Sequence, residues 1–281
     1  MTATVQQHPP VATGEPVLAL RGINKRFGAV RALTDVDFDV SLGEVVALVG
    51  DNGAGKSTLV KVIAGVGPAD SGEIRFDGQP VSIATPHGAQ DLGIATVFQD
   101  LALCDNLDVV GNLYLGREAV RGGLMNEVEM ERRSLELLRQ LAAKIPSVRT
   151  RVASLSGGQR QVVAISRSLL GNPKVVMLDE PTAALGVAQT AQVLNLIERL
   201  RERGLGVVLI SHNLADVFAV ADRIVVLRLG RNGGEFTVGE VDQDYVVSAI
   251  TGARDNVVAE RAARRAAAAH RATDAATDHG R

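Results

Sequence analysis

Short apolar runs and longer stretches of helical period alternate along this chain. Val45–Val49 is apolar at every position, which is typical of a strand buried on both faces of a parallel sheet. Comparable runs, or brief apolar–polar alternations, predict further strands at Pro16–Leu20, Val36–Val40, Ile74–Phe76, Ile94–Phe98, Val175–Leu178, Val207–Ile210 and Ile224–Leu227. The strands at 16–20 and 36–40 are expected to belong to an antiparallel β meander.

Stretches with a period near 3.6 residues predict the helices. They lie at Lys56–Ala64, Gln159–Leu169 and Gln189–Arg203, and residues 106–143 are expected to be mostly helical. Strands that alternate with helices indicate an α/β core with a mixed, mainly parallel sheet. The helical residues at 106–170 interrupt this alternation. We therefore expect one folded domain over residues 17–254, with an inserted helical subdomain at about residues 100–170.

The composition excludes several classes of protein. Of the 281 residues, 46% are hydrophobic and 22% are charged, which is ordinary for a folded protein. The 30 basic and 32 acidic side chains give a net charge of −2, so the composition does not favour nucleic acid as a partner. The single cysteine, Cys104, cannot form a disulfide within the chain.

The two ends differ from the rest of the chain. Residues 1–16 are polar and contain three prolines, which predicts disorder. Residues 255–281 are rich in Ala and Arg, so we expect disorder or a frayed helix there. The first residues lack the basic and apolar regions of a secretory signal, and no apolar run approaches the about 18 residues of a membrane helix. The chain is therefore expected in the cytoplasm.

A glycine-rich segment follows the strand at 45–49 and opens the helix at 56–64. It fits the pattern G-x-x-x-x-G-K-[ST] and comprises Gly50, Asp51, Asn52, Gly53, Ala54, Gly55, Lys56, Ser57 and Thr58. Glycines let backbone N–H groups turn toward bound phosphates, and the helix N-terminus adds positive potential. We expect Lys56 to reach the β- and γ-phosphates and the Ser57 hydroxyl to bind Mg²⁺. The alternative is a plain glycine-rich turn before a helix, which the strand–loop–helix context disfavours.

Two adjacent carboxylates, Asp179 and Glu180, follow the predicted strand at 175–178. Ligands of open α/β sheets bind at the carboxyl ends of the strands. Successive side chains of a strand point to opposite sides, so the two groups can serve two roles. We expect Asp179 to hold Mg²⁺ through water, and Glu180 to polarise the water that attacks the γ-phosphate. The alternative is a strand that runs into an acidic turn.

A third motif, LSGGQ, precedes this strand and contains Ser156, Gly157, Gly158 and Gln159. A serine and two glycines before a helix can bind an anion, or can simply cap the helix. LSGGQ between a phosphate loop and a carboxylate strand is the signature of ATP-binding-cassette (ABC) ATPases, which this chain resembles over about residues 17–250. The resemblance implies a P-loop NTPase core that binds ATP and Mg²⁺. It also implies two cassettes packed head to tail, with Ser156 and Gly158 on the γ-phosphate that the partner's Lys56 holds.

The resemblance assigns further residues. Gln99 matches the glutamine that senses Mg²⁺ and water and leads to the helical subdomain; the alternative is a surface glutamine. His212 matches the histidine that hydrogen-bonds the γ-phosphate and helps orient Glu180; the alternative is a capping or turn residue. Phe27 stands where the family more often has a Tyr against adenine; the alternative is a core residue. Gly186 stands where most cassettes have an Asp that crosses the dimer interface, which puts that hydrogen bonding in doubt.

The segments around these motifs resemble bacterial monosaccharide importers of the ribose, xylose and fructose group. GDNGAGKST, PTAALG and TVFQDLALCDNLDVVGNLYLGRE carry this likeness, and the single set of motifs matches the single-cassette members. The likeness implies a homodimer, or a pair with a second ABC ATPase chain, at the cytoplasmic face of the cell membrane. Its partners would be an integral-membrane permease and, indirectly, an extracytoplasmic sugar-binding protein, with no nucleic acid. The alternatives are a cassette for another solute and a non-transport cassette that acts on ribosomes or DNA.

Overall fold

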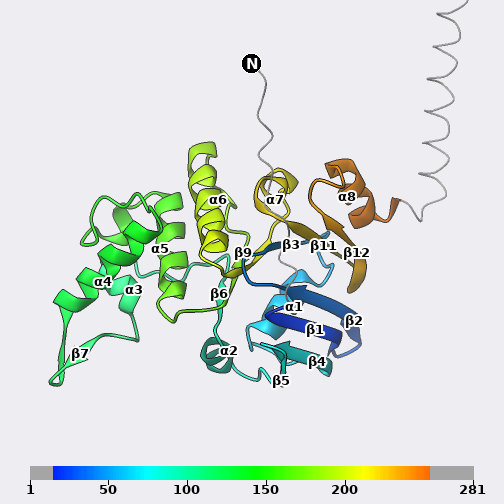
Figure 1. Cartoon of the computed structure of the whole chain (residues 1–281), viewed down its shortest axis with the longest axis horizontal. Helices are drawn as coiled ribbons and strands as arrows, with labels where there is room; N and C mark the ends of the chain where they lie inside the picture. Colours follow the sequence, from blue (N-terminus) through cyan, green and yellow to red (C-terminus); the bar gives the residue numbers. More distant parts are fainter. Residues whose placement is uncertain (1–14, 254–281) are drawn as a thin grey trace, which may run out of the picture.

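The computed structural model describes residues 15–253, so the predictions for residues 1–14 and 254–281 lie outside the described part. The described chain forms two larger sheets and a block of helices (Figure 1). The six-stranded sheet contains β3 (Val45–Val49), β6 (Ile94–Val97), β9 (Val175–Asp179), β10 (Gly206–Ile210), β11 (Arg223–Arg228) and β12 (Arg231–Thr237). The four-stranded sheet contains β1 (Leu18–Phe27), β2 (Val30–Val40), β4 (Ser71–Phe76) and β5 (Gln79–Val81).

The strand order of the larger sheet determines where a ligand can bind. It runs β12–β11–β3–β10–β9–β6, and every neighbouring pair is parallel except β11–β12. The mixed, mainly parallel sheet predicted from the sequence is therefore confirmed. β3 lies between β10 and β11, and the helix that follows it, α1 (Lys56–Ile63), begins at the carboxyl end of β3. Clefts at such positions are where open α/β sheets bind their ligands.

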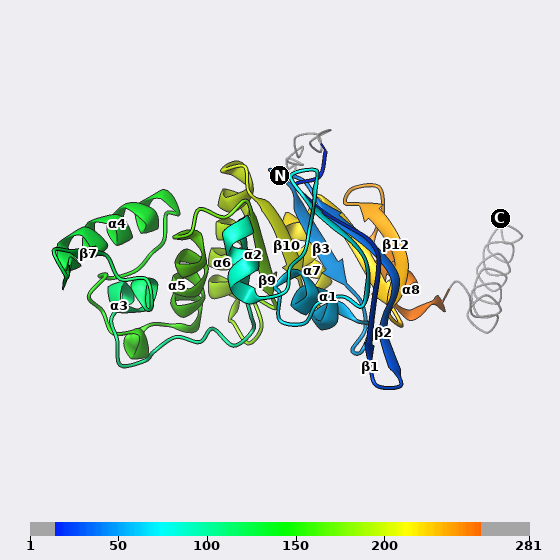
Figure 2. The same ribbon diagram turned by 90° about the horizontal axis from the view of Figure 1, so that it is seen from below.

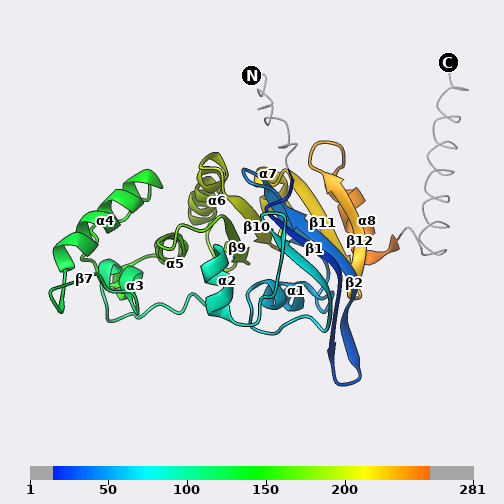
Figure 3. The same cartoon turned by 60° about the horizontal axis from the view of Figure 1, so that its bottom comes forward.

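The antiparallel meander is also confirmed, and it is larger than the sequence predicted. β1 pairs with both β2 and β4, and β5 extends β4. Its buried side chains share one hydrophobic cluster with α1 and with one face of the larger sheet. Figures 2 and 3 show the helical block at one end of the molecule and the meander toward the other, with β12 and α8 (Gln243–Thr251) beside the meander and β9 and β10 between the two ends.

One arginine joins β11 to the meander. Arg223 donates to Glu44 at 2.8 Å, to Asp39 at 2.9 Å and to Glu235 at 2.6 Å. Its side chain is 14% exposed and that of Glu44 only 2%. Burial alone would lower the pKa of Arg223, but the hydrogen bond and charge of Glu44 raise it above its usual value. The guanidinium therefore stays charged and forms ion pairs with all three carboxylates.

Arg223→Met is expected to lower the free energy of unfolding by about 3–5 kcal/mol, because it leaves the buried Glu44 carboxylate without its cation. Urea denaturation would measure the loss. Arg21→Met is the control, since Arg21 pairs with Asp39 while 47% exposed, and we expect about 0–1 kcal/mol there. Equal losses in the two variants would contradict the burial argument.

The prediction that residues 106–143 are mostly helical is correct only in part. The segment contains α3 (Val109–Tyr114) and α4 (Glu127–Gln140), separated by a hairpin of β7 (Val120–Arg121) and β8 (Leu124–Met125). Gly122 and Gly123 at the tip have φ of +62° and +81°, which other residues rarely adopt. The periodic apolar positions of α4 were visible in the sequence. The glycine turn, however, interrupts the helical structure between α3 and α4.

The remaining helices are short or were predicted with similar bounds. α5 (Gly157–Leu169) and α6 (Val187–Glu202) lie close to the predicted helices. Besides the β7–β8 hairpin, the elements that the sequence analysis did not single out are α2 (Pro86–Leu92), α7 (Leu214–Val220), α8, the edge strands β5 and β12, and a 3₁₀ turn at Val152–Ser154. Within the described residues, none of the helices has the length and hydropathy that a bilayer crossing requires.

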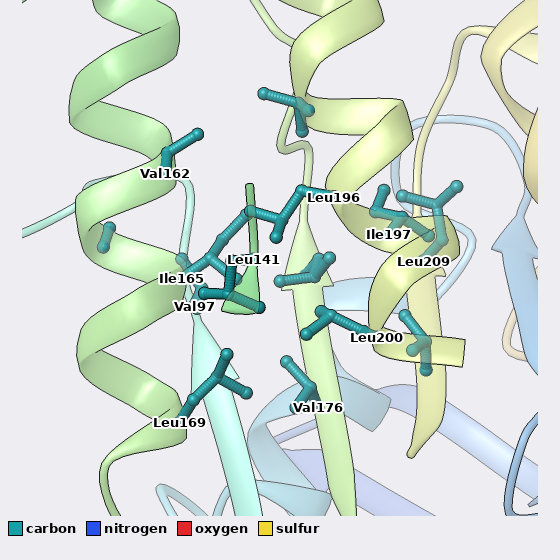
Figure 4. Close-up of a cluster of buried hydrophobic side chains, with 14 of the residues drawn as sticks. Val97, Leu141, Val162, Ile165, Leu169, Val176, Leu196, Ile197, Leu200 and Leu209 are labelled. Carbon is teal, nitrogen blue, oxygen red and sulfur yellow. The ribbon is translucent and has the colours of Figure 1, made fainter. Parts of the chain in front are cut away.

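A dense apolar contact fixes the helical block to the sheet. α5 and α6 lie side by side, α5 against β6 and α6 against β10, with Ile165 and Leu169 of α5 facing Leu196 and Leu200 of α6 (Figure 4). These side chains are at most 6% exposed. The N-terminus of α5, where the LSGGQ motif lies, is thereby held in a fixed position relative to the strands that carry the carboxylates.

Candidate nucleotide-binding site

Parallel neighbours bring the predicted catalytic residues to one edge of the six-stranded sheet. Val97 of β6 is paired with Leu178 of β9, which is paired with Leu209 of β10, and β10 is paired with β3. Since these strands run in the same direction, the residues that follow them lie at the same edge. Those residues are Gln99 after β6, Glu180 after β9, His212 after β10 and the phosphate loop after β3.

The phosphate loop requires glycine for reasons of space as well as conformation. Gly50 has φ of +152°, and a Cβ there would lie 2.2 Å from the carbonyl oxygen of Leu227. Gly55 has φ of +106°, and its Cβ would lie 2.8 Å from a methyl of Leu33. The loop is thus pressed between β2 and the turn after β11, with Ala54 buried and Asp51, Asn52, Gly53 and Ser57 exposed.

Lys56 occupies the inside of this loop. Its Nζ donates to the carbonyl oxygens of Gly50 at 2.7 Å and Asp51 at 3.1 Å. These neutral acceptors hold the ammonium among the backbone atoms that a phosphate would approach. Phosphate oxygens form stronger, charge-assisted hydrogen bonds with an ammonium, so a bound nucleotide would compete well for this lysine.

Asp179 lies half-buried at the end of β9. Burial raises the pKa of its carboxyl, and the charge of Glu180 adds to this, whereas Lys56 and Lys61 lower it. Among the described residues, no group of three or more His, Cys, Asp or Glu is placed to hold a metal ion. The donor set fits Mg²⁺ bound by one carboxylate, the Ser57 hydroxyl, waters and nucleotide phosphates, which is how Mg²⁺ is usually held.

Asp179→Asn is expected to stabilise the nucleotide-free protein at neutral pH and to remove its stabilisation by Mg²⁺ with ATP. The pKa of Asp179 is raised by folding, so the unfolded chain releases this proton at a lower pH than the folded chain. The carboxyl therefore costs no stability below its ordinary value of 3.8 and its full cost above the folded value. Thermal unfolding between about pH 3 and pH 7 should show the advantage of the variant growing as the pH rises.

Asp105→Asn provides the control for this experiment, because Asp105 carries an exposed carboxylate outside the site. It should show neither the pH-dependent gain nor the loss of the nucleotide effect. If Asp179→Asn were stabilised by Mg²⁺ with ATP as strongly as the unmodified protein, Asp179 would not be a metal ligand.

Glu180 and His212 contact each other directly. His212 Nδ1 lies 2.7 Å from Glu180 Oε2, and the histidine side chain is 71% exposed while that of the glutamate is 15% exposed. Glu180 has φ of +50°, and its backbone N–H donates to the carbonyl of Ile210 at 2.9 Å. This unusual backbone conformation turns the carboxylate out of the strand direction and toward the residue that follows β10. The pair is arranged so that the imidazole can hold the carboxylate in one orientation.

Two residues that sequence analysis did not single out fix this pair. The Thr182 hydroxyl donates to Asp216 Oδ2 at 2.7 Å, and both side chains are buried. Thr182 lies in the turn after Glu180, and Asp216 lies on α7, which begins just after His212. The hydrogen bond therefore joins the two segments that carry the carboxylate and the imidazole. Because α7 itself was not predicted from the sequence, no sequence signal marked Asp216 as a buried partner.

Phe27 and Gln99 are both accessible to a ligand. The ring of Phe27 is 56% exposed at the end of β1, which excludes the alternative that it is a core residue. The Lys25 ammonium lies 5.6 Å from its centroid. Gln99 is exposed beyond β6.

The LSGGQ residues are away from the phosphate loop of the same chain. Ser156 caps α5 by accepting from the Gln159 N–H at 3.3 Å, and the Gln159 side chain accepts from the Ser156 N–H at 3.0 Å. Cβ atoms at Gly157 and Gly158 would lie 3.0 Å and 2.9 Å from the side chains of Leu185 and Gln189. In all three views α5 and α1 lie on opposite sides of β9 (Figures 1, 2 and 3).

This fold, with a phosphate loop at one edge and LSGGQ on a separate helical block, defines an ATP-binding cassette. The model of the ABC transporter family matches residues 33–183, and the chain belongs to that family. Among solved structures it is similar to the ADP conformation of an ATP-binding cassette of an ABC transporter, with a TM-score of 0.73 and 26% identity over 85% of this chain and 96% of that one. It is also similar to a dimeric, post-hydrolysis cassette bound to ADP and phosphate, with a TM-score of 0.66 and 27% identity over 79% and 98% of the two chains.

Curated relatives are more similar in sequence. The chain is 44% identical to the fructose import ATP-binding protein of Rhizobium meliloti over 86% of its own length and 96% of the relative. It is 45% identical to the xylose/arabinose import ATP-binding protein of Sulfolobus acidocaldarius over 76% and 86% of the two chains. It is 43% identical to a ribose import ATP-binding protein of Rubrobacter xylanophilus, of which it spans only 47%. The chain thus spans about half of the ribose relative and nearly all of the fructose relative.

Proposed function

We propose that this chain is the ATP-binding and ATP-hydrolysing subunit of an ABC importer, and that it energises the uptake of a monosaccharide through a membrane permease. The observation that carries the ATPase part is the contact between Glu180 and His212, at the same sheet edge as the phosphate loop. The substrate class rests on the fructose and xylose/arabinose relatives, which this chain matches over most of their length.

The chemistry follows from positions and charges. Lys56 and the loop N–H groups neutralise the phosphates and hold them in line for attack. Mg²⁺, bound through Ser57, Asp179 and Gln99, would supply further positive charge to the β- and γ-phosphates. Glu180 accepts a proton from the attacking water, and His212 keeps its carboxylate oriented and contacts the γ-phosphate. Phe27 stacks on adenine.

The second half of each site comes from another cassette. α5 and α1 of one chain lie on opposite sides of β9, so the LSGGQ residues are far from the phosphate loop of their own chain. We infer that they contact the nucleotide bound by a partner cassette. The similar cassette that was solved as a dimer with ADP and phosphate supports a pair of cassettes, and the head-to-tail arrangement is part of this proposal. The partner is a second copy of this chain or a second ABC ATPase chain, and Ser156 to Gln159 contact its ATP.

Ser156→Arg is expected to abolish ATP hydrolysis while the affinity of the isolated subunit for ATP stays unchanged. The bulky cation would occupy the space where the γ-phosphate of the partner enters, but it lies away from the phosphate loop of its own chain. Turnover and equilibrium binding of a fluorescent ATP analogue would test this. Ser71→Arg, on an exposed strand of the meander, should alter neither, and equal loss of binding and turnover in Ser156→Arg would assign the serine to its own chain's site.

A groove beside Gln99 is the proposed docking place for the permease. It has a volume of about 750 Å³ and lies between α2 and β6 on one side and the C-terminal half of α5 on the other. A permease segment bound there would sense movement of Gln99 when ATP binds. In this arrangement the chain lies peripherally at the cytoplasmic face of the membrane, and an extracytoplasmic binding protein delivers sugar to the permease.

Affinity purification from native membranes would test the function. Tagged Glu180→Gln protein would be purified in mild detergent with Mg²⁺ and ATP, and the copurified proteins identified by mass spectrometry. A polytopic membrane protein together with an extracytoplasmic protein that binds a monosaccharide in direct titration would support the proposal. A permease whose binding protein takes another solute would overturn the sugar assignment, and cytosolic or ribosomal partners alone would overturn the transport assignment.

A further inference from the structure

We propose that Arg117 and Arg167 form an anion-binding end of the groove beside Gln99, and that this end binds a carboxylate side chain of the permease segment that docks there. The inference rests on the proposed function, because the permease is the partner that it assigns to the groove. It adds the chemistry by which that partner is recognised.

Arg167 is held rigidly at this end of the groove. It lies near the C-terminus of α5 and donates to the carbonyl oxygens of Leu101 at 2.8 Å and Ala102 at 2.9 Å. Its pKa is lowered by burial and by the positive charge of Arg117. A guanidinium has five N–H donors, and the two recorded bonds leave others free for an anion. The cation therefore sits half-buried, against a like charge, at the surface of a cavity.

The second positive charge is Arg117, which comes from the segment after α3 rather than from α5. It follows α3, and its Nη1 would lie 4.0 Å from a Cβ at Gly171, just after the end of α5. Its side chain is exposed and lines the groove together with that of Arg167. Within residues 15–253, neither guanidinium forms an ion pair with a carboxylate. Two unneutralised arginines that face one cavity attract an anion strongly.

The carboxylates of the groove itself are directed elsewhere. Asp91 lies 3.5 Å from His87 on α2, and Asp100 accepts the N–H of Ala102. The recorded hydrogen bonds of Arg167 go to backbone carbonyls and not to either carboxylate. The groove thus has one acidic side chain on α2 and another beside Ala102, and neither neutralises the two arginines. A ligand that fits has its negative charge at the arginine end.

Apolar side chains beside the arginines indicate a protein segment as the occupant. Leu115 is 46% exposed and Phe98 is 38% exposed, and both line the groove. A small inorganic anion would satisfy the arginines but would leave this apolar surface in water. A segment with apolar side chains and one Asp or Glu would satisfy both features, which is the pattern of an amphipathic helix that docks into a groove.

The test compares charge variants for recovery of the copurified membrane protein. Arg117→Glu, Arg117→Lys and the control Arg121→Glu would each be tagged in the full chain and purified from native membranes. Arg121 is exposed on the nearby hairpin and does not line the groove. We expect Arg117→Glu to lower the recovered permease at least tenfold, with Arg117→Lys and Arg121→Glu close to the unmodified chain. ATP hydrolysis by the isolated subunit should be unchanged in all three.

A charge exchange then identifies the carboxylate. Each Asp and Glu in the cytoplasmic loops of the copurified permease would be changed to Arg and paired with Arg117→Glu, and recovery of one such pair is the expected result. Normal recovery with Arg117→Glu, or no rescue by any exchange, would overturn the inference and leave the proposed function standing. If the unmodified chain copurified with no membrane protein, the proposed function would fail and this inference with it. Thermal stabilisation by inorganic phosphate that Arg117→Glu abolishes would instead assign the arginines to a free anion.

Discussion

Glu180→Gln is expected to bind ATP with unchanged affinity and to hydrolyse it about a hundred- to ten-thousand-fold more slowly. Glutamine keeps the size and one hydrogen-bonding oxygen of the side chain, so the 2.7 Å contact with His212 can persist. It cannot accept the proton of the attacking water. In the proposed pair of cassettes hydrolysis would reopen the dimer, so the variant should accumulate as an ATP-bound dimer. Phosphate release and light scattering in saturating Mg²⁺ and ATP would measure the two effects.

Glu202→Gln is the matched control, since Glu202 is exposed at the end of α6 and far from the phosphate loop along the chain. It should leave turnover and mass unaltered. If Glu180→Gln hydrolysed ATP at more than a tenth of the normal rate, the carboxylate would not be the base. If it stayed monomeric, the head-to-tail pair would require the permease.

Lys56→Ala is expected to abolish turnover and to weaken ATP binding by at least a hundredfold. The lysine is the side-chain cation inside the phosphate loop, and charge-assisted bonds to phosphate are worth about 1.5–3 kcal/mol each. Removing it also frees the carbonyls of Gly50 and Asp51. Calorimetric titration with ATP and with ADP would measure the loss, which should be larger for ATP because the γ-phosphate loses its partner too.

Lys61→Ala provides the comparison on the same helix. Lys61 lies in the last turn of α1, one turn beyond the residues that would touch phosphate, so its removal should change ATP affinity by less than a few fold. A Lys56→Ala variant with normal affinity would mean that the loop does not bind phosphate through this side chain.

The parts of the fold that depend on burial were predictable from the sequence. β3, β9, β10 and β11 are apolar at nearly every position, because each is covered on both faces, and such runs are recognisable without tertiary information. The phosphate loop was predictable for a different local reason, because its glycines are required by the conformation of the loop backbone itself. The residues of the hairpin at 120–125 carry no such local signal apart from Gly122–Gly123, and they were assigned to a helix.

What sequence could not provide was the pairing of residues distant along the chain. Thr182 and Asp216 form their bond only because the turn after β9 and the start of α7 meet at the sheet edge. Likewise, nothing in the residues around 117 or 167 indicates that their guanidinium groups face one cavity. Such features depend on strand order and helix packing, which periodicity does not encode.

The packing of Gly157 and Gly158 against Leu185 and Gln189 has a consequence for how two cassettes would work together. The turn that starts at Glu180 reaches the LSGGQ loop of the same chain without an intervening gap. A displacement of this turn during hydrolysis would therefore also shift the LSGGQ loop, which in the proposed pair contacts the nucleotide of the partner cassette. In a head-to-tail pair the two ATP molecules would not be consumed independently, and the first cleavage would set the pace of the second.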